Sequence, residues 1–358
     1  MNLYVASTSG NSGKTLVSLG LAKIWAGRGV SVGYVKPLGK IPVVDDGTVA
    51  DEDAAFLAKE LGLAGPPEAA CPVVITQDLL MSAYRGDLTG LRERVAHAVT
   101  DAAARCDVLL LGGAANLRDG IFLGLSPLDI VADHDCKVIL VDRFRGEMSM
   151  DQVLWAARML GDRLLGVILN RVDAARETFV RDMVRPFFEA RGIRTYGAVP
   201  VDPLLDSVSV GALAAALPAT VEWGEDRLDT MIERFCVGAM DVESALRVFR
   251  RIPRKAVVTG GSRADIQLAA LETDTRCLVL TGGISPSDLI LHKAEEKGVP
   301  VLVCRHETML AVERLEKLVG RRRIREREKI ERGVGLVSSH VDAAGILAAL
   351  RGGGRPSK

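Results

Sequence analysis

The stretch VASTSGNSGKTLVSLGLA, residues 5–22, passes from an apolar segment through a loop of small residues into a helix-forming segment. Backbone N–H groups at a helix N-terminus have no partner within the helix, and the helix dipole adds partial positive charge there. A loop that opens such a helix can therefore wrap an anion such as phosphate. The feature restricts the chain to folds in which a strand leads through a tight loop into a helix.

The residues of this loop predict a phosphate site. The candidate binding residues are Thr8, Gly10, Asn11, Ser12, Gly13, Lys14 and Thr15. The two glycines permit close approach and unusual backbone angles. Lys14 is expected to reach the β- and γ-phosphates, and the Thr15 hydroxyl to ligate Mg²⁺. The general phosphate-loop pattern has glycine where this chain has Thr8, and an ordinary Gly/Ser turn is the alternative interpretation.

Composition limits the classes of partner. The chain has 358 residues, which favours two domains, and its 46 basic and 46 acidic residues balance. We therefore expect no nucleic-acid or membrane partner. The six cysteines lie far apart without metal-ligand spacing, which favours a reducing compartment. The N-terminus lacks a leader pattern, and no run approaches about eighteen apolar residues, so the expected location is cytoplasmic.

Short apolar runs alternate with amphipathic stretches through the first part of the chain. The runs are NLYVAS at 2–7, VSVGYVK at 30–36, CPVVI at 71–75, DVLLLG at 107–112, KVILVD at 137–142, LLGVILN at 164–170 and RTYGAV at 194–199. Runs rich in Val, Ile and Leu are typical of strands covered on both faces by helices. The pattern predicts an α/β fold with a doubly wound, largely parallel sheet, in which ligands gather at the carboxyl ends of the strands.

The alternation of apolar runs with amphipathic stretches ends where Pro, Gly and charged residues cluster, and we place a domain boundary there. The prediction is a first domain over 1–217, a linker over 218–226, a second domain over 227–345 and a disordered tail over 346–358. The segments at 228–239 and 241–251 are expected to be helical. Three βα units follow, and two of their strands end in the same string, T-G-G, which indicates a local duplication. These strings can form a second anion site, and the alternative is that their glycines merely turn the chain.

A strongly basic run, GRRRIREREKIERG at 320–333, precedes the expected tail. Such a run can grip the phosphates of RNA or of a ligand. Because glutamates are interleaved with the basic residues, the pattern favours a solvated helix with internal ion pairs.

The first domain resembles the dethiobiotin synthetase family of P-loop proteins. The resemblance rests on threonine at position 8, on Lys36-Pro37 after the second apolar run, and on the strings at 51–63, 162–172 and 191–205. The segment VVTGGSRADIQLAALETDTRCLVLTGG at 257–283 resembles DRTGG domains, although the five-residue string itself is absent. The same pair of domains forms the N-terminal half of many bacterial phosphotransacetylases, and the chain looks like that half without the acetyltransferase domain.

The resemblance implies roles for four further residues. Asn170 matches an asparagine that reads adenine, for which an amide offers one donor and one acceptor; a turn-forming role is the alternative. Lys36, with Lys14 a candidate catalytic residue, matches a lysine that positions a carboxylated substrate, or it is a structural cation. Asp53 matches a magnesium-binding aspartate, and Asp51 is a second candidate ligand. Both acids also suit a helix N-terminus without any metal.

One departure from the family concerns the metal. Dethiobiotin synthetases place a glutamate at the end of the fourth strand, where this chain has Leu111 and Gly112, neither of which ligates a cation. Asp142 is a nearby substitute or a turn residue. Loss of the carboxylate is expected to impair phosphoryl transfer more than binding.

Three functions follow. The preferred one is a regulatory protein whose first domain binds ATP with Mg²⁺ and whose DRTGG domain senses a second small anion or mediates assembly. The alternatives are an ATP-dependent ligase or carboxylase of the dethiobiotin synthetase type, and a non-enzymatic scaffold for a partner enzyme. The resemblance also implies a homodimer.

Overall fold

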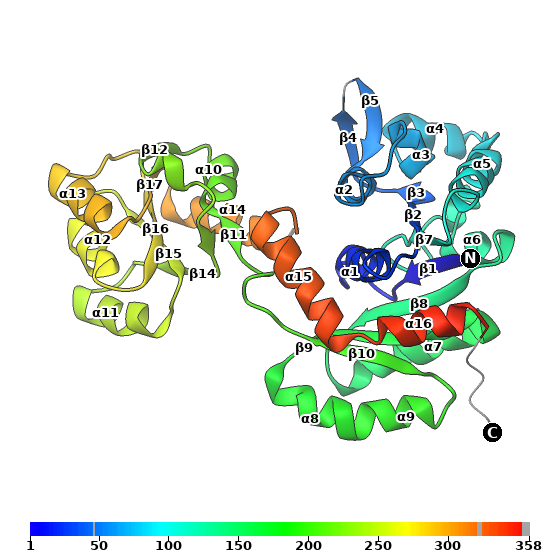
Figure 1. Ribbon diagram of the computed structural model, residues 1–358. Helices are drawn as coiled ribbons and strands as arrows, with labels where there is room; N and C mark the ends of the chain where they lie inside the picture. The colour runs from blue at the N-terminus through cyan, green and yellow to red at the C-terminus, as the bar shows by residue number, and fades with distance from the viewer. Residues whose placement is uncertain (46, 321–323, 353–358) are drawn as a thin grey trace. The chain divides into compact units, whose positions relative to one another are not determined.

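A computed structural model describes residues 1–45, 47–320 and 324–352 of the chain (Figure 1). It divides into two compact units. The first unit combines Met1–Val201 with Arg325–Lys358, and the second is Asp202–Ile324. The second unit is therefore inserted into the first, and the P-loop unit is completed by the C-terminal segment of the chain.

The first unit is built on a six-stranded sheet in the order β10-β9-β8-β1-β7-β2, with every pairing parallel. Its strands are β1 Asn2–Ala6, β2 Val32–Val35, β7 Val108–Gly112, β8 Lys137–Arg143, β9 Leu164–Val172 and β10 Thr195–Pro200. Successive residues such as Leu109 and Leu110 are both fully buried. The apolar runs thus face helices on both sides, as a doubly wound sheet requires. The predicted α/β class is confirmed.

One of the predicted strands lies outside this sheet. The run CPVVI contributes two residues, β6 Val73–Val74, which pair in parallel with β3 Leu38–Gly39. Pro72 directly precedes β6 and has no N–H to donate to a longer ladder. A separate antiparallel hairpin is formed by β4 Pro42–Asp45 and β5 Thr48–Asp51.

The helices of the first unit cover both faces of the sheet. They are α1 Lys14–Ala26, α2 Glu52–Glu60, α3 Pro67–Ala70, α4 Gln77–Tyr84, α5 Leu91–Ala103, α6 Pro127–Asp133, α7 Met150–Leu160, α8 Glu177–Phe179, α9 Arg185–Glu189, α15 Arg327–His340 and α16 Ala343–Leu350. Helices α5, α6 and α7 share one buried core with alternate strand residues such as Leu109 and Leu140. Helix α1 packs against α15 and α16.

The packing of α15 and α16 corrects the predicted domain boundaries. The Trp25 indole, which is fully buried, donates to the Ala343 carbonyl oxygen over 2.9 Å. A methyl group built on Gly20 would lie 2.6 Å from Val337 Cβ, so the two helices touch closely. Residues 325–350 therefore belong to the P-loop unit, because they cover a face of α1. Helix α16 occupies part of the predicted tail, whose residues 353–358 lie outside the described residues.

The second unit has its own five-stranded sheet in the order β12-β17-β16-β15-β14, parallel except for β12. Its elements are β11 Val208–Ser209, α10 Val210–Ala216, β12 Thr220–Trp223, β13 Met231–Ile232, β14 Arg234–Val237, α11 Val242–Arg251, β15 Lys255–Gly260, α12 Ala264–Leu271, β16 Thr275–Thr281, α13 Asp288–Lys297, β17 Val301–Val303 and α14 Thr308–Gly320. The three expected βα units are β15–α12, β16–α13 and β17–α14.

Three local predictions in this unit are wrong. The expected linker 218–226 contains β12, which pairs with β17. The expected helix at 228–239 contains β13 and β14, because β14 completes the sheet beside β15. Helix α10, assigned from the sequence to the first domain, places Leu213 and Leu217 in the core of the second.

Candidate phosphate-loop site

The phosphate loop joins β1 to α1 at the carboxyl end of the central strand β1. Gly13 precedes the first helical residue with φ 95°, a left-handed conformation that costs other L-residues about 1–2 kcal/mol. Its carbonyl oxygen accepts from Val17 N over 3.0 Å, which starts the helical ladder. Glycine is thus required at position 13 to turn the loop into the helix.

Lys14 carries the positive charge of the loop. Its Nζ donates to Ser7 Oγ over 2.7 Å and lies 3.5 Å from the Ala115 carbonyl oxygen. Burial, together with the charge of Lys36, lowers the pKa of Lys14 to about 8. Within the part of the chain that the structure describes, no carboxylate lies within ion-pair distance of this ammonium group. The group is therefore a partly buried cation whose hydrogen bonds are with neutral oxygens.

Ser12 and Asn170 join the loop to β9. Asn170 Nδ2 donates to the Ser12 carbonyl oxygen over 2.8 Å, and its Oδ1 accepts from Arg171 N over 2.9 Å. The Ser12 hydroxyl is fully buried and has no hydrogen-bond partner among the residues that the structure describes. The predicted adenine-reading residue thus holds the loop through the same amide, which retains one further N–H and one further lone pair.

Thr8, which stands where glycine is usual, is held by side chains at the end of β8 and in α7. Its hydroxyl donates to the Asp142 carboxylate and lies 3.0 Å from Gln152 Oε1. Burial raises the pKa of Asp142, although the hydrogen bonds from Thr8 oppose this rise. Asp142 is therefore a partner of the loop threonine.

Asp51 begins α2 as its N-cap and is fully buried. Its carboxylate accepts from Lys36 Nζ over 2.7 Å and from the backbone N–H groups of Lys40, Ile41, Asp53 and Ala54. A carboxylate offers about four acceptor sites, so these donors use its capacity. We assign Asp51 to the helix cap, and Lys36, which is itself buried, to the ion pair that compensates its charge.

Asp53 lies in the first turn of α2 and contacts two cations. Its Oδ2 is 3.5 Å from Lys36 Nζ, and its Oδ1 is 2.8 Å from Arg325 Nη2. Burial alone would raise the pKa of Asp53, but the Lys36 charge and the Arg325 hydrogen bond outweigh it and hold the pKa below its ordinary value. Arg325 was not predicted as a site residue, because it lies 272 residues from Asp53 in a run that resembles a solvated helix.

The position of the missing glutamate is filled by other side chains. Leu111 is fully buried in the core beneath the sheet. A methyl group built on Gly112 would lie 2.1 Å from Tyr34 Oη, so the tyrosine occupies the space that a side chain there would need. Burial, with the charges of Asp53 and Asp51, raises the pKa of Tyr34 well above its ordinary value. A neutral hydroxyl therefore stands beside the site in place of a carboxylate.

The oxygen atoms of the site fit a magnesium ion that is held mainly by water and by the oxygens of a bound phosphate. In the described ranges, no three His, Cys, Asp or Glu side chains are grouped to hold a metal. Thr15, in the first turn of α1, and Asp53 offer oxygen atoms of the kind that Mg²⁺ prefers. Such an ion would keep water and phosphate oxygens as its other ligands, as Mg²⁺ commonly does.

The two T-G-G strings of the second unit use their amides within the fold. Gly261 N donates to the Thr281 carbonyl oxygen, and Gly282 and Gly283 donate to carbonyl oxygens of the segment after β17. Gln267 Nε2 donates back to the carbonyl oxygens of Gly260 and Gly261. Three of the four glycine amides are thus engaged in turning the chain rather than in forming an anion cradle.

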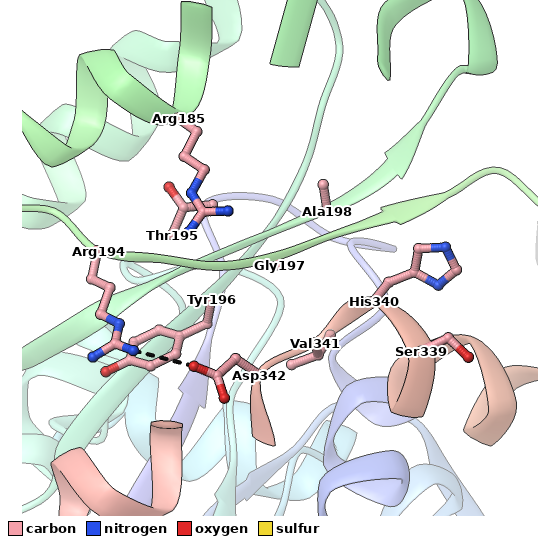
Figure 2. A pocket seen from close by; sticks show the side chains of 10 residues that line it. All are labelled: Arg185, Arg194, Thr195, Tyr196, Gly197, Ala198, Ser339, His340, Val341 and Asp342. Atoms are coloured by element: carbon pink, nitrogen blue, oxygen red, sulfur yellow. Dashed lines mark hydrogen bonds and ion pairs between the residues drawn. The ribbon is translucent and has the colours of Figure 1, made fainter. Parts of the chain in front are cut away.

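A cavity of about 400 Å³ lies along edge strand β10, beside the turn between α15 and α16 (Figure 2). The lining includes Arg185 and Arg194, whose guanidinium groups pair with Glu189 over 2.8 Å and with Asp342 over 3.2 Å. The cavity lies beside the first residues of β10, whereas the phosphate loop comes after the last residue of β1. We therefore treat it as separate from the phosphate-loop site.

Among the residues that the structure describes, no helix is both long and apolar enough to cross a bilayer. The described cysteines at positions 71, 106, 136, 236, 277 and 304 carry no disulfide.

Each of the two units matches a known domain family. The model of the AAA domain family matches residues 1–209, and that of the DRTGG domain matches residues 212–318. The phosphate acetyltransferase of Pseudomonas aeruginosa is 26% identical over 367 residues, covering 95% of this chain and 50% of that protein. The ATP-dependent dethiobiotin synthetase of Methanococcus vannielii is 26% identical, covering 55% of this chain and 92% of that enzyme. The chain spans about half the length of the phosphate acetyltransferases it matches.

Among solved structures, the septum site-determining protein MinD of Pyrococcus horikoshii, complexed with Mg-ADP, is 20% identical with a TM-score of 0.37. The match covers 57% of this chain and 84% of that one. The sequence matches confirm the expected resemblance to dethiobiotin synthetases and to the N-terminal region of phosphotransacetylases. The chain belongs to the AAA domain family, whose model matches its P-loop unit, and its second unit is a DRTGG domain.

Proposed function

We propose that the phosphate loop binds the triphosphate of ATP with Mg²⁺, and that this binding serves regulation rather than sustained catalysis. The observation that carries the proposal is the Lys14 ammonium group, which is partly buried and hydrogen-bonded to neutral oxygens. A cation in this state gains most from an anionic ligand, because it has already lost part of its hydration. The Ser12 hydroxyl, which is unpartnered within the described part of the chain, supports a loop that is adapted to a ligand.

The same site supports binding more than turnover. Phosphoryl transfer depends on cations and metal ligands that stabilise the transferring group. Here Leu111 and Gly112 supply no carboxylate, and the Lys36 ammonium is committed to Asp51 and Asp53. We therefore place a dethiobiotin synthetase-type ligase second, because its substrate-holding lysine would have to leave a buried ion pair.

The second unit then has the role of a reporter or sensor. The relationship to the N-terminal region of phosphate acetyltransferases supports regulation of such an enzyme, or of a partner carrying that activity. A dimer and a second anionic ligand of the DRTGG domain remain part of the proposal. Sedimentation velocity with and without Mg-ATP tests the dimer.

Titration calorimetry with Mg-ATP tests the phosphate site. We expect Lys14→Ala to weaken ATP binding by about thirtyfold or more, since a hydrogen-bonded charge contributes about 2 kcal/mol. Lys23→Ala is the matched control, because Lys23 lies in the same helix and pairs with Glu60 at a partly exposed position. Equal affinities of wild type and Lys14→Ala would refute the phosphate-loop assignment.

Phosphate release by the purified protein tests regulation against catalysis. We expect slow or undetectable hydrolysis of ATP. Steady turnover that depends on a small carboxylic or amino substrate would instead support the ligase.

A further inference from the structure

We propose that Arg325 is the resident counter-ion of Asp53, and that Mg-ATP binds by displacing its guanidinium group from this carboxylate. Arg325 then sets the magnesium concentration at which the phosphate loop fills. The inference rests on the proposed nucleotide function and names a residue that regulates the same site.

The geometry shows a defined contact. Arg325 Nη2 lies 2.8 Å from Asp53 Oδ1 and 3.7 Å from Glu52 Oε1. The guanidinium plane is also supported by the Phe56 ring, whose centroid is 4.0 Å from Arg325 Cζ. An arginine held by a carboxylate and an aromatic face has a preferred position, unlike a freely solvated surface charge.

Asp53 is the carboxylate for which a metal and Arg325 compete. Asp51 is committed to the cap of α2, and the strand end at Leu111 and Gly112 supplies no acid. A divalent ion on Asp53 would stand within a few ångströms of the Arg325 charge. Because like charges at this distance repel, the metal and the guanidinium group cannot both gain the full attraction of one carboxylate.

Of the two cations on Asp53, Arg325 is the exchangeable one. Lys36 is 6% exposed and is anchored by a shorter ion pair, 2.7 Å, to the fully buried Asp51. The Arg325 side chain is 27% exposed, so its guanidinium group can reach water when it leaves Asp53. Removal of Lys36 would strip a buried acid of its partner, which is far more costly.

The position of Arg325 in the chain connects the exchange of cations on Asp53 to the second unit. It is the first residue of the P-loop unit after the inserted unit, which ends at Ile324. A change at Asp53 therefore acts on the point where the DRTGG unit rejoins the P-loop unit. This arrangement links occupancy of the metal site to the second unit through a covalent connection.

The test is calorimetric titration of the full chain with ATP at a series of Mg²⁺ concentrations, and again with chelator. We expect Arg325→Gln to lower the Mg²⁺ concentration for half-maximal ATP binding by about two- to fivefold, the range of a partly exposed ion pair. Arg327→Gln is the matched control. It removes the same charge two residues further along the chain, where Arg327 forms an exposed ion pair with Glu331. It should leave the magnesium midpoint unchanged.

Other results would overturn the inference. An unchanged magnesium midpoint in Arg325→Gln, or weaker ATP binding with and without Mg²⁺, would show that Arg325 does not compete with the metal. Arg325→Lys provides a second variant if the glutamine protein unfolds; it should shift the midpoint in the same direction, because lysine loses the planar contact with Phe56. Failure of the wild type to bind ATP at any Mg²⁺ concentration would overturn the proposed function as well.

Discussion

Asn170, near the carboxyl end of β9, donates a hydrogen bond to the carbonyl oxygen of Ser12, 158 residues earlier in the chain. The bond joins the phosphate loop to a strand two places away in the sheet. A methyl group built on Gly13 would lie 2.0 Å from the same amide nitrogen, so the side chain is packed directly on the loop. The shape of the loop therefore depends on a residue outside the phosphate motif.

Replacement of Asn170 by alanine should both destabilise the protein and weaken ATP binding. We expect a loss of about 1–2 kcal/mol in the free energy of unfolding, because the bond breaks and the Ser12 carbonyl loses its donor. Urea unfolding and calorimetry measure the two effects. Asn2→Ala is the control, since Asn2 Nδ2 makes a similar bond of 2.9 Å to the His134 carbonyl oxygen at the opposite end of β1. Unchanged ATP affinity in Asn170→Ala would contradict the prediction.

The two glycines of the loop should respond differently to alanine. Gly13 has φ 95° and faces Asn170, so Gly13→Ala incurs backbone strain of about 1–2 kcal/mol and a steric clash. At Gly10 an added methyl group would meet Ala115 Cβ at an ordinary 3.7 Å. We expect Gly13→Ala to abolish measurable ATP binding and Gly10→Ala to retain it, as judged by calorimetry on folded protein. Equal behaviour of the two variants would refute this account of the loop.

The contact between α1 and α15 predicts opposite effects of glycine-to-alanine changes in helices. Gly335 of α15 has open space at its Cβ position, so Gly335→Ala should stabilise the protein by up to about 1 kcal/mol. At Gly20 of α1 the new methyl group would overlap the stiff Val337 side chain, and overpacking should cost about 1–3 kcal/mol. Chemical unfolding of both variants measures the difference. Stabilisation by Gly20→Ala would argue against the close packing of α15 on α1.

The lowered pKa of Lys14 predicts a pH dependence of binding. Above pH 8 the free protein loses the Lys14 charge, whereas bound phosphate keeps the lysine protonated, so ATP affinity should fall by up to tenfold per pH unit. The stability of the folded protein changes in the opposite direction. Below about pH 8 the buried Lys14 charge destabilises the fold, and stability rises as the pH increases from there towards the ordinary lysine pKa. Calorimetry between pH 7 and 9.5 measures the affinity, and Lys14→Arg is the control, because arginine stays charged. An affinity independent of pH in the wild type would contradict the prediction.

The sequence predicted the parts of the site that are local. The path from β1 through the glycine loop into α1 follows from nearest neighbours, and the Val-, Ile- and Leu-rich runs indicate strands buried on both faces. The βα rhythm of the second unit is equally local. The helix prediction at 228–239 failed because β14 forms by pairing with β15, a contact that the segment itself does not encode.

The remaining features depend on distant contacts. Arg325 meets Asp53, Tyr34 fills the space at Gly112, and α15 covers α1, although these partners are far apart in the chain. The boundary error has the same cause, because an inserted unit makes sequence order differ from spatial order. By itself, the sequence determined the local path from a strand through a glycine loop with one lysine into a helix, where we propose that a phosphate binds. The tertiary structure decided which carboxylates are committed to caps and ion pairs, since burial and long-range pairing set the charge balance of the site.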